Sequence, residues 1–135
     1  MNNLTWKYVK KLKNKKAIEN FENENKIKLP IDIIECVKKN NGGRPNKKTF
    51  DTENSKERVI KNLLSFNSDD LETVYSIFEV LNKEDNRLFP IASDPSGNYI
   101  CYDLMNKKIV LWLHETNKVE NISNDFSEFL DALYE

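Results

Sequence analysis

Long apolar runs, cysteines and histidines are scarce in this sequence of 135 residues. No stretch contains 18 or more consecutive apolar residues, so no segment has the length and hydropathy of a transmembrane helix. The first residues, MNNLTWKYVKKLKNKK, contain no continuous apolar segment after their charges, so a signal peptide is not expected and the protein is expected to be cytoplasmic. Without a secretion signal, Cys36 and Cys101 are expected to be reduced, buried thiols.

Side chains for metal binding and catalysis are equally few. His114 is the one histidine, and neither cysteine has a second cysteine two to four residues away, so a zinc site would lack ligands. The sequence DPSGN (94–98) has one glycine and no following lysine or helix, so it is not a phosphate-binding loop. A type I turn with Pro95 in second position and Gly97 at positive φ explains it. We therefore expect no metal, no cofactor and no catalytic residue.

The charges are distributed unevenly along the chain. Residues 1–48 carry 13 Lys+Arg against 5 Asp+Glu, whereas residues 49–135 carry 8 against 17. The basic run KYVKKLKNKK lacks the interleaved aromatics and glycine-rich loops of a nucleic-acid-binding module, and a solvated surface explains it more simply. The acidic remainder attracts basic partners and repels nucleic acid. With 39% apolar residues the chain is expected to form one domain, 1–135, in which 1–14 is a peripheral helix or arm.

Apolar periodicity and turn signals predict an alternation of helices and strands. A helix is predicted over 30–40, where Pro30 suits the first turn and the letters NGG (41–43) end it. Another is predicted over 69–84, with Asp69 as N-cap, Glu72 three residues later, and a buried stripe of Leu71, Val74, Phe78 and Leu81. The remaining elements are helices at 15–25 and 123–135, strands at 47–53 and 58–66, and a three-stranded antiparallel meander over 88–114.

The hairpin around residues 105–108 determines whether Asp103 and His114 lie close enough to act together. A symmetric turn at MNKK (105–108) would place Tyr99 opposite His114, Cys101 opposite Trp112 and Asp103 opposite Val110 on one face. The other face is apolar and is expected to be covered by helices. Asp103 and His114 are then roughly 13 Å apart at ~3.3 Å per residue. A carboxylate that orients a general base must lie within about 3 Å of it, so no catalytic dyad is expected.

Four blocks of the sequence resemble the SUKH superfamily, in its Smi/Knr-like branch. They are KLPIDIIECVKKNNGGRP (28–45), LFPIASDPSGNYICYDL (88–104), IVLWLHE (109–115) and DFSEFLDAL (125–133). The order and spacing of the blocks agree as well, and the resemblance covers about residues 15–134. It implies an α+β fold in which a twisted, mainly antiparallel sheet is flanked by helices, as the periodicity also indicates.

The resemblance further implies a function by binding rather than by catalysis. Bacterial members are mostly immunity proteins that neutralise a toxin, often a nuclease or deaminase, and eukaryotic relatives are regulatory scaffolds. We expect an immunity protein that occludes a cognate toxin stoichiometrically, as a monomer or weak dimer, without small-molecule substrate, nucleic acid or membrane. A regulatory or adaptor scaffold is the alternative, and an enzyme or nucleic-acid binder is a third class. The expected contact residues are Asp69, Asp70, Glu72, Tyr99, Asp103, Trp112, His114 and Glu115.

Overall fold

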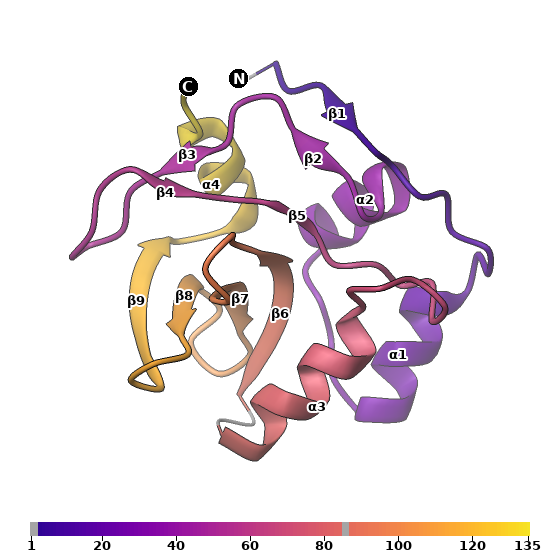
Figure 1. Ribbon diagram of the computed structural model, residues 1–135. Helices are drawn as coiled ribbons and strands as arrows, with labels where there is room; N and C mark the ends of the chain where they lie inside the picture. The colour runs from indigo at the N-terminus through magenta and orange to yellow at the C-terminus, as the bar shows by residue number, and fades with distance from the viewer. Residues whose placement is uncertain (1–2, 85–86) are drawn as a thin grey trace.

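The computed structural model describes residues 3–84 and 87–135 and has an α+β fold, as predicted (Figure 1). Its main sheet is antiparallel with the order β5-β6-β7-β8-β9, formed by β5 (Asn62–Leu63), β6 (Leu88–Ser93), β7 (Tyr99–Asp103), β8 (Ile109–Leu113) and β9 (Lys118–Ser123). Two smaller ribbons pair β1 (Trp6–Lys7) with β2 (Arg44–Pro45), and β3 (Thr49–Phe50) with β4 (Arg58–Val59). The helices are α1 (Ala17–Asn25), α2 (Ile31–Asn40), α3 (Val74–Glu84) and α4 (Phe126–Ala132).

The predicted meander is present as β6, β7 and β8, and the sheet continues into β9, which the sequence did not predict. In KVENIS (118–123) the half-buried positions do not alternate regularly with exposed ones, so a period-two pattern is missing. The strands expected over 47–53 and 58–66 are much shorter than predicted. Their apolar positions are nevertheless buried, including Ile60, Leu64 and Phe66.

Helices cover both faces of the sheet. On one face Ile100, Ile109 and Leu111 join the main core with residues of α1, α2 and α4. Phe21 of α1 connects this core to α3 and β6, since its ring centroid lies 5.1 Å from that of Phe78 and 5.5 Å from that of Phe89. On the other face a second cluster packs Leu81 of α3 against sheet residues that include Cys101, Val110 and Trp112. This second face, predicted to be the less apolar one, is therefore also part of the interior.

The hairpin between β7 and β8 has a different register from the predicted one. Tyr99 pairs with Trp112 and Cys101 with Val110, a shift of two residues that keeps each side chain on its predicted face. The cause lies in the turn, where the Asp103 carboxylate accepts the backbone N–H groups of Met105 and Asn106 at 2.9 and 3.0 Å. Asp103 and Lys108 close the loop by a backbone bond of 2.8 Å. The shift places Asp103 and His114 farther apart than predicted.

Helix α3 begins at Val74, five residues after the predicted N-cap. Its first turn is capped by Thr73, whose hydroxyl oxygen accepts the N–H of Ser76 at 3.2 Å. Asp69 and Asp70 lie in the preceding loop, where they bind other segments instead of the helix. Asp69 pairs with Lys13, and Asp70 accepts the Ser65 hydroxyl at 2.5 Å. The prediction of Asp69 as N-cap was therefore wrong.

Residues 3–14, here called the N-terminal arm, run in extended form along the outside of α2 toward α1 (Figure 1). Two buried asparagines hold the arm. Asn41 exchanges bonds with Lys10, accepting its N–H on the backbone oxygen at 2.7 Å and donating from its side-chain amide to the Lys10 carbonyl at 2.8 Å. Asn67 accepts the N–H of Lys13 and donates to the carbonyl of Lys11, both at 2.9 Å. The arm is thus fixed to the end of α2 and to the loop between β5 and α3.

Candidate functional site

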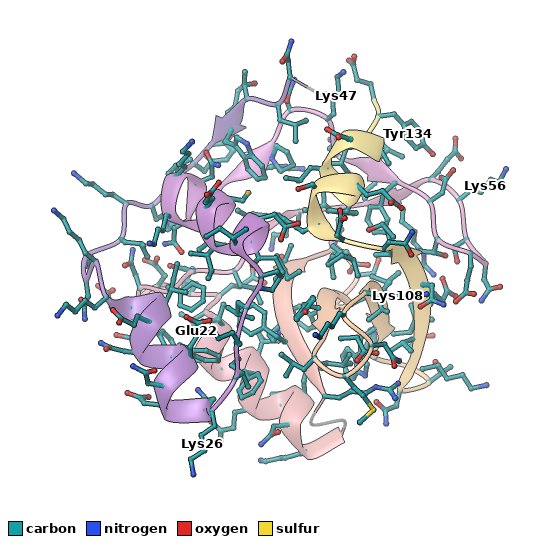
Figure 2. All side chains as sticks on the ribbon, turned by 180° about the vertical axis from the view of Figure 1, so that it is seen from behind. Glu22, Lys26, Lys47, Lys56, Lys108 and Tyr134 are labelled. Atoms are coloured by element: carbon teal, nitrogen blue, oxygen red, sulfur yellow. The ribbon has the colours of Figure 1, made fainter. Side chains whose placement is uncertain are left out.

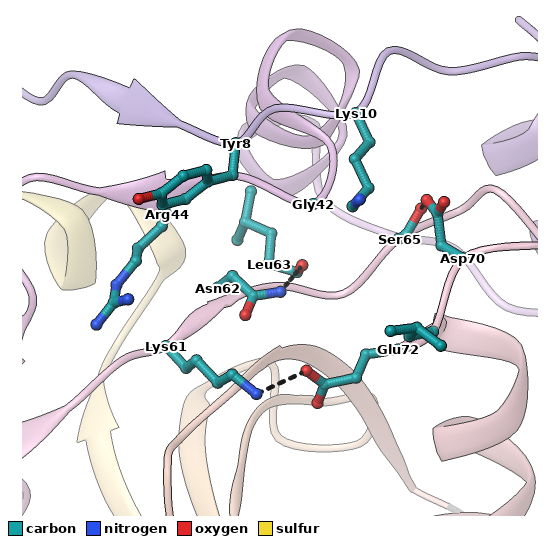
Figure 3. Close-up of a pocket in the computed structure, with 11 residues that line it drawn as sticks. Tyr8, Lys10, Gly42, Arg44, Lys61, Asn62, Leu63, Ser65, Asp70 and Glu72 are labelled. Carbon is teal, nitrogen blue, oxygen red and sulfur yellow. Dashed lines mark hydrogen bonds and ion pairs between the residues drawn. The ribbon is translucent and has the colours of Figure 1, made fainter.

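A groove separates the N-terminal arm from β5 and the loop before α3, and we call it the arm groove (Figure 3). It has a volume of about 300 Å³, and its lining includes the buried Leu63 of β5 and Gly42, which lies between α2 and β2. Gly42 has φ +72°, and a Cβ there would lie 3.4 Å from the side-chain carbons of Lys10. Glycine therefore permits both the backbone conformation and the close approach of the lysine stem.

Two exposed apolar side chains stand at opposite sides of the arm groove. Leu71, on the loop before α3, is fully exposed, with a relative exposure of 102%, although the sequence placed it in a buried helical stripe. Tyr8, on the arm, is 72% exposed and has φ +61°, a left-handed conformation that is unfavourable for a bulky side chain. The strained backbone conformation thus accompanies a Tyr8 ring that is exposed to solvent instead of packed in the interior. Strain and exposed apolar surface together are typical of contact sites.

Charged groups surround the apolar floor of the arm groove. Lys61 and Glu72 form an ion pair of 3.1 Å across its lower side (Figure 3). Lys10 extends from the arm toward the space between Gly42 and Ser65 (Figure 3). Within residues 3–84 and 87–135, no hydrogen-bond or ion-pair partner is found for the side-chain nitrogens of Lys10 or Arg44. With Glu72 paired to Lys61, these two cations remain against one carboxylate, Asp70, so the net charge of the groove is positive.

Three of the predicted contact residues lie at or beside this groove. Asp70 and Glu72 line it, and the exposed Asp69 neighbours it, where hydrogen bonding from Lys13 lowers the pKa of the Asp69 carboxyl. Tyr99 is half-buried at the near end of β7, and its pKa is raised first by burial and then by the negative charge of Glu72. Sequence reasoning missed Tyr8, Lys10 and Leu71, because only the folded arm brings positions 8 and 71 to one groove.

Two other predicted contact residues are interior. Asp103 is 3% exposed and stabilises its turn, with Arg87 Nε at 3.6 Å from its carboxylate. Trp112 is 6% exposed, its indole N–H donates to Asn117 Oδ1 at 2.7 Å, and its ring stacks on Tyr99 with centroids 6.2 Å apart. Their prediction as surface contacts is not supported by their burial. Both are structural residues.

His114 and Glu115 are exposed at the end of β8, in a separate hollow that Arg58 also lines. The N–H of His114 donates to Asn98 Oδ1 at 3.1 Å, and a Cβ at Gly97 would lie 3.5 Å from the imidazole Cδ2. The imidazole therefore covers the DPSGN turn, in which Gly97 has φ +89° as predicted. Asp94 fixes that turn by accepting the N–H groups of Ser96 and Asn98, both at 2.8 Å.

The described part of the chain contains no group of three or more His, Cys, Asp or Glu side chains arranged to hold a metal ion. Cys36 on α2 and Cys101 on β7 are not joined in a disulfide. Burial raises the pKa of the Cys36 thiol to about 11, so the thiol remains protonated at neutral pH. Among the helices that the structure describes, none combines the length and apolar character needed to cross a membrane.

Comparison with known proteins identifies the family of this chain. A family model described as SMI1-KNR4 cell-wall, SUKH_6, matches residues 15–130. The chain belongs to the SUKH superfamily. A Bacillus subtilis (strain 168) relative, the SPbeta prophage-derived uncharacterized protein YokK, is 42% identical over 50 residues, which make up 34% of this chain and 26% of that protein. No solved structure matches the chain.

Membership in the SUKH superfamily has two broad consequences. It supports a toxin-immunity type of role with a protein partner, and the family consists in general of non-catalytic proteins. The matched region begins at residue 15, after the whole N-terminal arm. Tyr8 and Lys10 therefore belong to a part of the arm groove that the family model does not include, whereas Leu71 and Glu72 lie within the match.

Proposed function

We propose that this protein is an immunity protein that binds one cognate protein toxin and neutralises it by stoichiometric occlusion. The SUKH match over residues 15–130 supports the class of function. The single observation that carries the binding mode is the display of Tyr8 and Leu71 around the arm groove, against normal burial and backbone preference. Aromatic and aliphatic anchors at the centre of a charged rim are the usual source of affinity in protein interfaces.

The proposed contact surface combines the arm groove with acidic residues predicted from the sequence, of which Asp69 is exposed and Asp70 and Glu72 are half-buried. Asp69, Asp70 and Glu72 form the rim beside Leu71, and Tyr99 continues this rim toward the sheet. His114 and Glu115 form a second contact patch at the end of β8. A nuclease or deaminase toxin is the proposed target, because the acidic residues of the chain after position 48 favour association with a basic protein.

Occlusion requires only that the bound toxin cannot reach its substrate. A stable complex typically buries on the order of 1,600 Å² in total, far more than the arm groove alone, so the rim and the second patch are expected to contribute area. The groove provides the anchor positions and the charged rim controls the rate of encounter. The mechanism needs no bond to form or break.

Growth rescue is the test. The toxin domain encoded by the adjacent reading frame is expressed in a bacterial host with this protein or with its Leu71→Asp variant, and the two proteins are also copurified. Wild-type protein should restore growth and copurify in a 1:1 complex, and Leu71→Asp should do neither. Failure of the wild-type protein to rescue growth or to bind the toxin would contradict the proposal. Binding to a host protein with no toxin encoded nearby would instead favour a regulatory scaffold.

A further inference from the structure

The apolar and charged groups of the arm groove indicate the chemistry of the ligand that it binds. Leu63 beneath the groove is fully buried, so the exposed apolar surface of the groove is that of Tyr8 and Leu71, which bound it on both sides. A cavity of about 300 Å³ is large enough for one or two side chains of a partner. A matching ligand therefore contributes an apolar side chain at its centre.

The charges of the arm groove do not cancel. Glu72 is compensated by Lys61, whereas the partner of Asp70 is the neutral Ser65 hydroxyl, which leaves one carboxylate charge at the groove. Among the residues that the structure describes, Lys10 and Arg44 have no side-chain partner. Both therefore remain available to a carboxylate, and an Arg guanidinium can bind a carboxylate with two parallel hydrogen bonds.

We infer that the arm groove receives an acidic segment of the toxin, in which a leucine or aromatic side chain is flanked by Asp or Glu. This inference rests on the proposed function and adds the chemistry of one contact. A nucleic-acid strand fits less well, because it carries a charge at every nucleotide, whereas the described residues of the groove offer two cations without a side-chain partner, Lys10 and Arg44. The contacted segment is therefore not the basic, nucleic-acid-binding surface of a nuclease toxin.

The N-terminal arm sets this specificity. Lys10 and Tyr8 both come from the arm, which lies outside the family match, and the arm is held in place by Asn41 and Asn67. The packing of the Lys10 stem over Gly42 directs the lysine head toward the groove. Changing arm residues should therefore change partner choice without changing the fold.

A pair of short peptides tests the groove without any toxin. The ¹⁵N-labelled protein is titrated with Ac-Glu-Leu-Glu-NH₂ and, as the matched control, with Ac-Lys-Leu-Lys-NH₂. The acidic peptide should shift the amide signals of Tyr8, Lys10, Gly42 and Leu71 and should bind at least about fivefold more tightly than the basic one, in proportion to a modest charge–charge attraction at a surface site. Equal binding, preference for the basic peptide, or shifts located elsewhere would overturn the inference.

Charge reversal supplies the second arm of the test. The double variant Lys10→Glu with Arg44→Glu should reverse the peptide preference, and Lys56→Glu, on the distant β3–β4 hairpin, should leave it unchanged. A 15-nucleotide single strand that shifts the same amides with steep salt dependence would reassign the groove to nucleic acid. The spectrum of each variant shows whether it is folded, and Lys10→Ala with Arg44→Ala serves as a milder pair that should abolish the preference.

The affinity of the double variant for the toxin distinguishes this inference from the proposed function. If the wild-type protein binds the toxin, the double reversal should weaken binding at least tenfold, as expected for close charge pairs at an interface. Unchanged toxin affinity of the double variant would overturn the acidic-segment inference and leave the immunity function standing. Selective binding of the acidic peptide together with no binding of the adjacent toxin would contradict the immunity function and leave the preference of the groove for acidic segments standing.

Discussion

The backbone N–H of Lys13 donates to the side-chain oxygen of Asn67 at 2.9 Å, across 54 positions of the sequence. This bond, with the reciprocal one to the carbonyl of Lys11, attaches the N-terminal arm to the loop before α3. Asn67 is buried, so its amide cannot exchange these bonds for water. The position of the arm, and hence the shape of the arm groove, depends on the side chains of Asn67 and Asn41 together with the pairing of β1 with β2.

Replacing Asn67 should release the arm. Asn67→Ala removes two side-chain–backbone hydrogen bonds to the arm, each worth about 0.5–1.5 kcal/mol, and should lower the free energy of unfolding by about 1–3 kcal/mol. Hydrogen exchange followed by mass spectrometry should show faster exchange at residues 10–14. Asn54→Ala, an exposed asparagine on the β3–β4 hairpin, is the control and should change neither quantity. Unaltered protection of residues 10–14 in Asn67→Ala would show that other contacts fix the arm.

The strained tyrosine offers a prediction in which stability and binding change in opposite directions. Glycine relieves the left-handed strain at position 8, so Tyr8→Gly should keep or raise the free energy of unfolding by up to roughly 1 kcal/mol. The same variant should bind the toxin at least tenfold more weakly, because the exposed ring is lost. Urea denaturation and calorimetric titration measure the two effects. Met105→Ala removes another exposed apolar side chain, far from the groove along the sheet, and should affect neither.

Trp112 should behave as an interior residue. Trp112→Phe removes the indole donor to Asn117 and part of the packing against Leu81 and Tyr99, so it should lower the free energy of unfolding by about 1–3 kcal/mol. Where the variant is still folded, its affinity for the toxin should equal that of the wild type. His114→Ala changes an exposed residue and should shift stability by no more than about 0.5 kcal/mol. A binding defect in a fully folded Trp112→Phe protein would contradict this prediction and indicate that Trp112 contacts the toxin.

Cys36 should react slowly with thiol reagents. Burial raises its pKa to about 11 from 9.0, so at pH 8 the native protein should carry roughly a hundredfold less reactive thiolate there than an ordinary cysteine. The labelling rate, followed by peptide mass mapping, should increase about tenfold per pH unit up to that pKa. Since the folded pKa is the higher one, the associated stability is complete below pH 9 and decreases above it. Rapid labelling of the native protein at neutral pH would contradict this environment.

The C-terminus is held by Tyr134, whose hydroxyl donates to Asp51 at 2.6 Å on the side of the molecule shown in Figure 2. This bond is the main reason that the pKa of Asp51 is lowered and that of Tyr134 raised. The contribution of Asp51 is therefore present above its unfolded pKa and lost as pH falls through the lowered folded value, whereas that of Tyr134 is lost as pH rises past 10.

Removing the hydroxyl tests this assignment. In Tyr134→Phe the pKa of Asp51, followed by NMR titration, should rise toward its ordinary value of 3.8. It should stop short of that value, because the N–H of Glu57 still donates to Asp51 at 3.0 Å. Tyr8→Phe is the matched control on an exposed tyrosine. An unchanged Asp51 titration in Tyr134→Phe would mean that the hydrogen bond is not formed in solution.

Local sequence signals predicted the elements whose determinants are close in the chain. The apolar stripe between Pro30 and Asn41-Gly42-Gly43 gave α2, and the short apolar runs around the DPSGN turn gave β6 and β7. Asp125 was predicted within the first turn of the last helix, and it caps α4 by accepting the N–H of Glu128 at 2.8 Å. The same kind of signal failed at Asp69, where a bond to the distant Lys13 replaced the local capping interaction. The predicted register of β7 and β8 was wrong because the Asp103 carboxylate binds backbone N–H groups of the turn and changes its conformation.

The amino-acid sequence by itself determined the α+β class, the family and most of the helices and strands, because short-range periodicity, turn residues and motif spacing are contained in neighbouring positions. Only the tertiary structure decided which polar and apolar groups reach the surface. Leu81 of α3 closes over Trp112, and two asparagines bring Tyr8 to the groove that Leu71 borders. Exposure depends on contacts between segments more than 30 positions apart, and such contacts leave no local pattern in the chain.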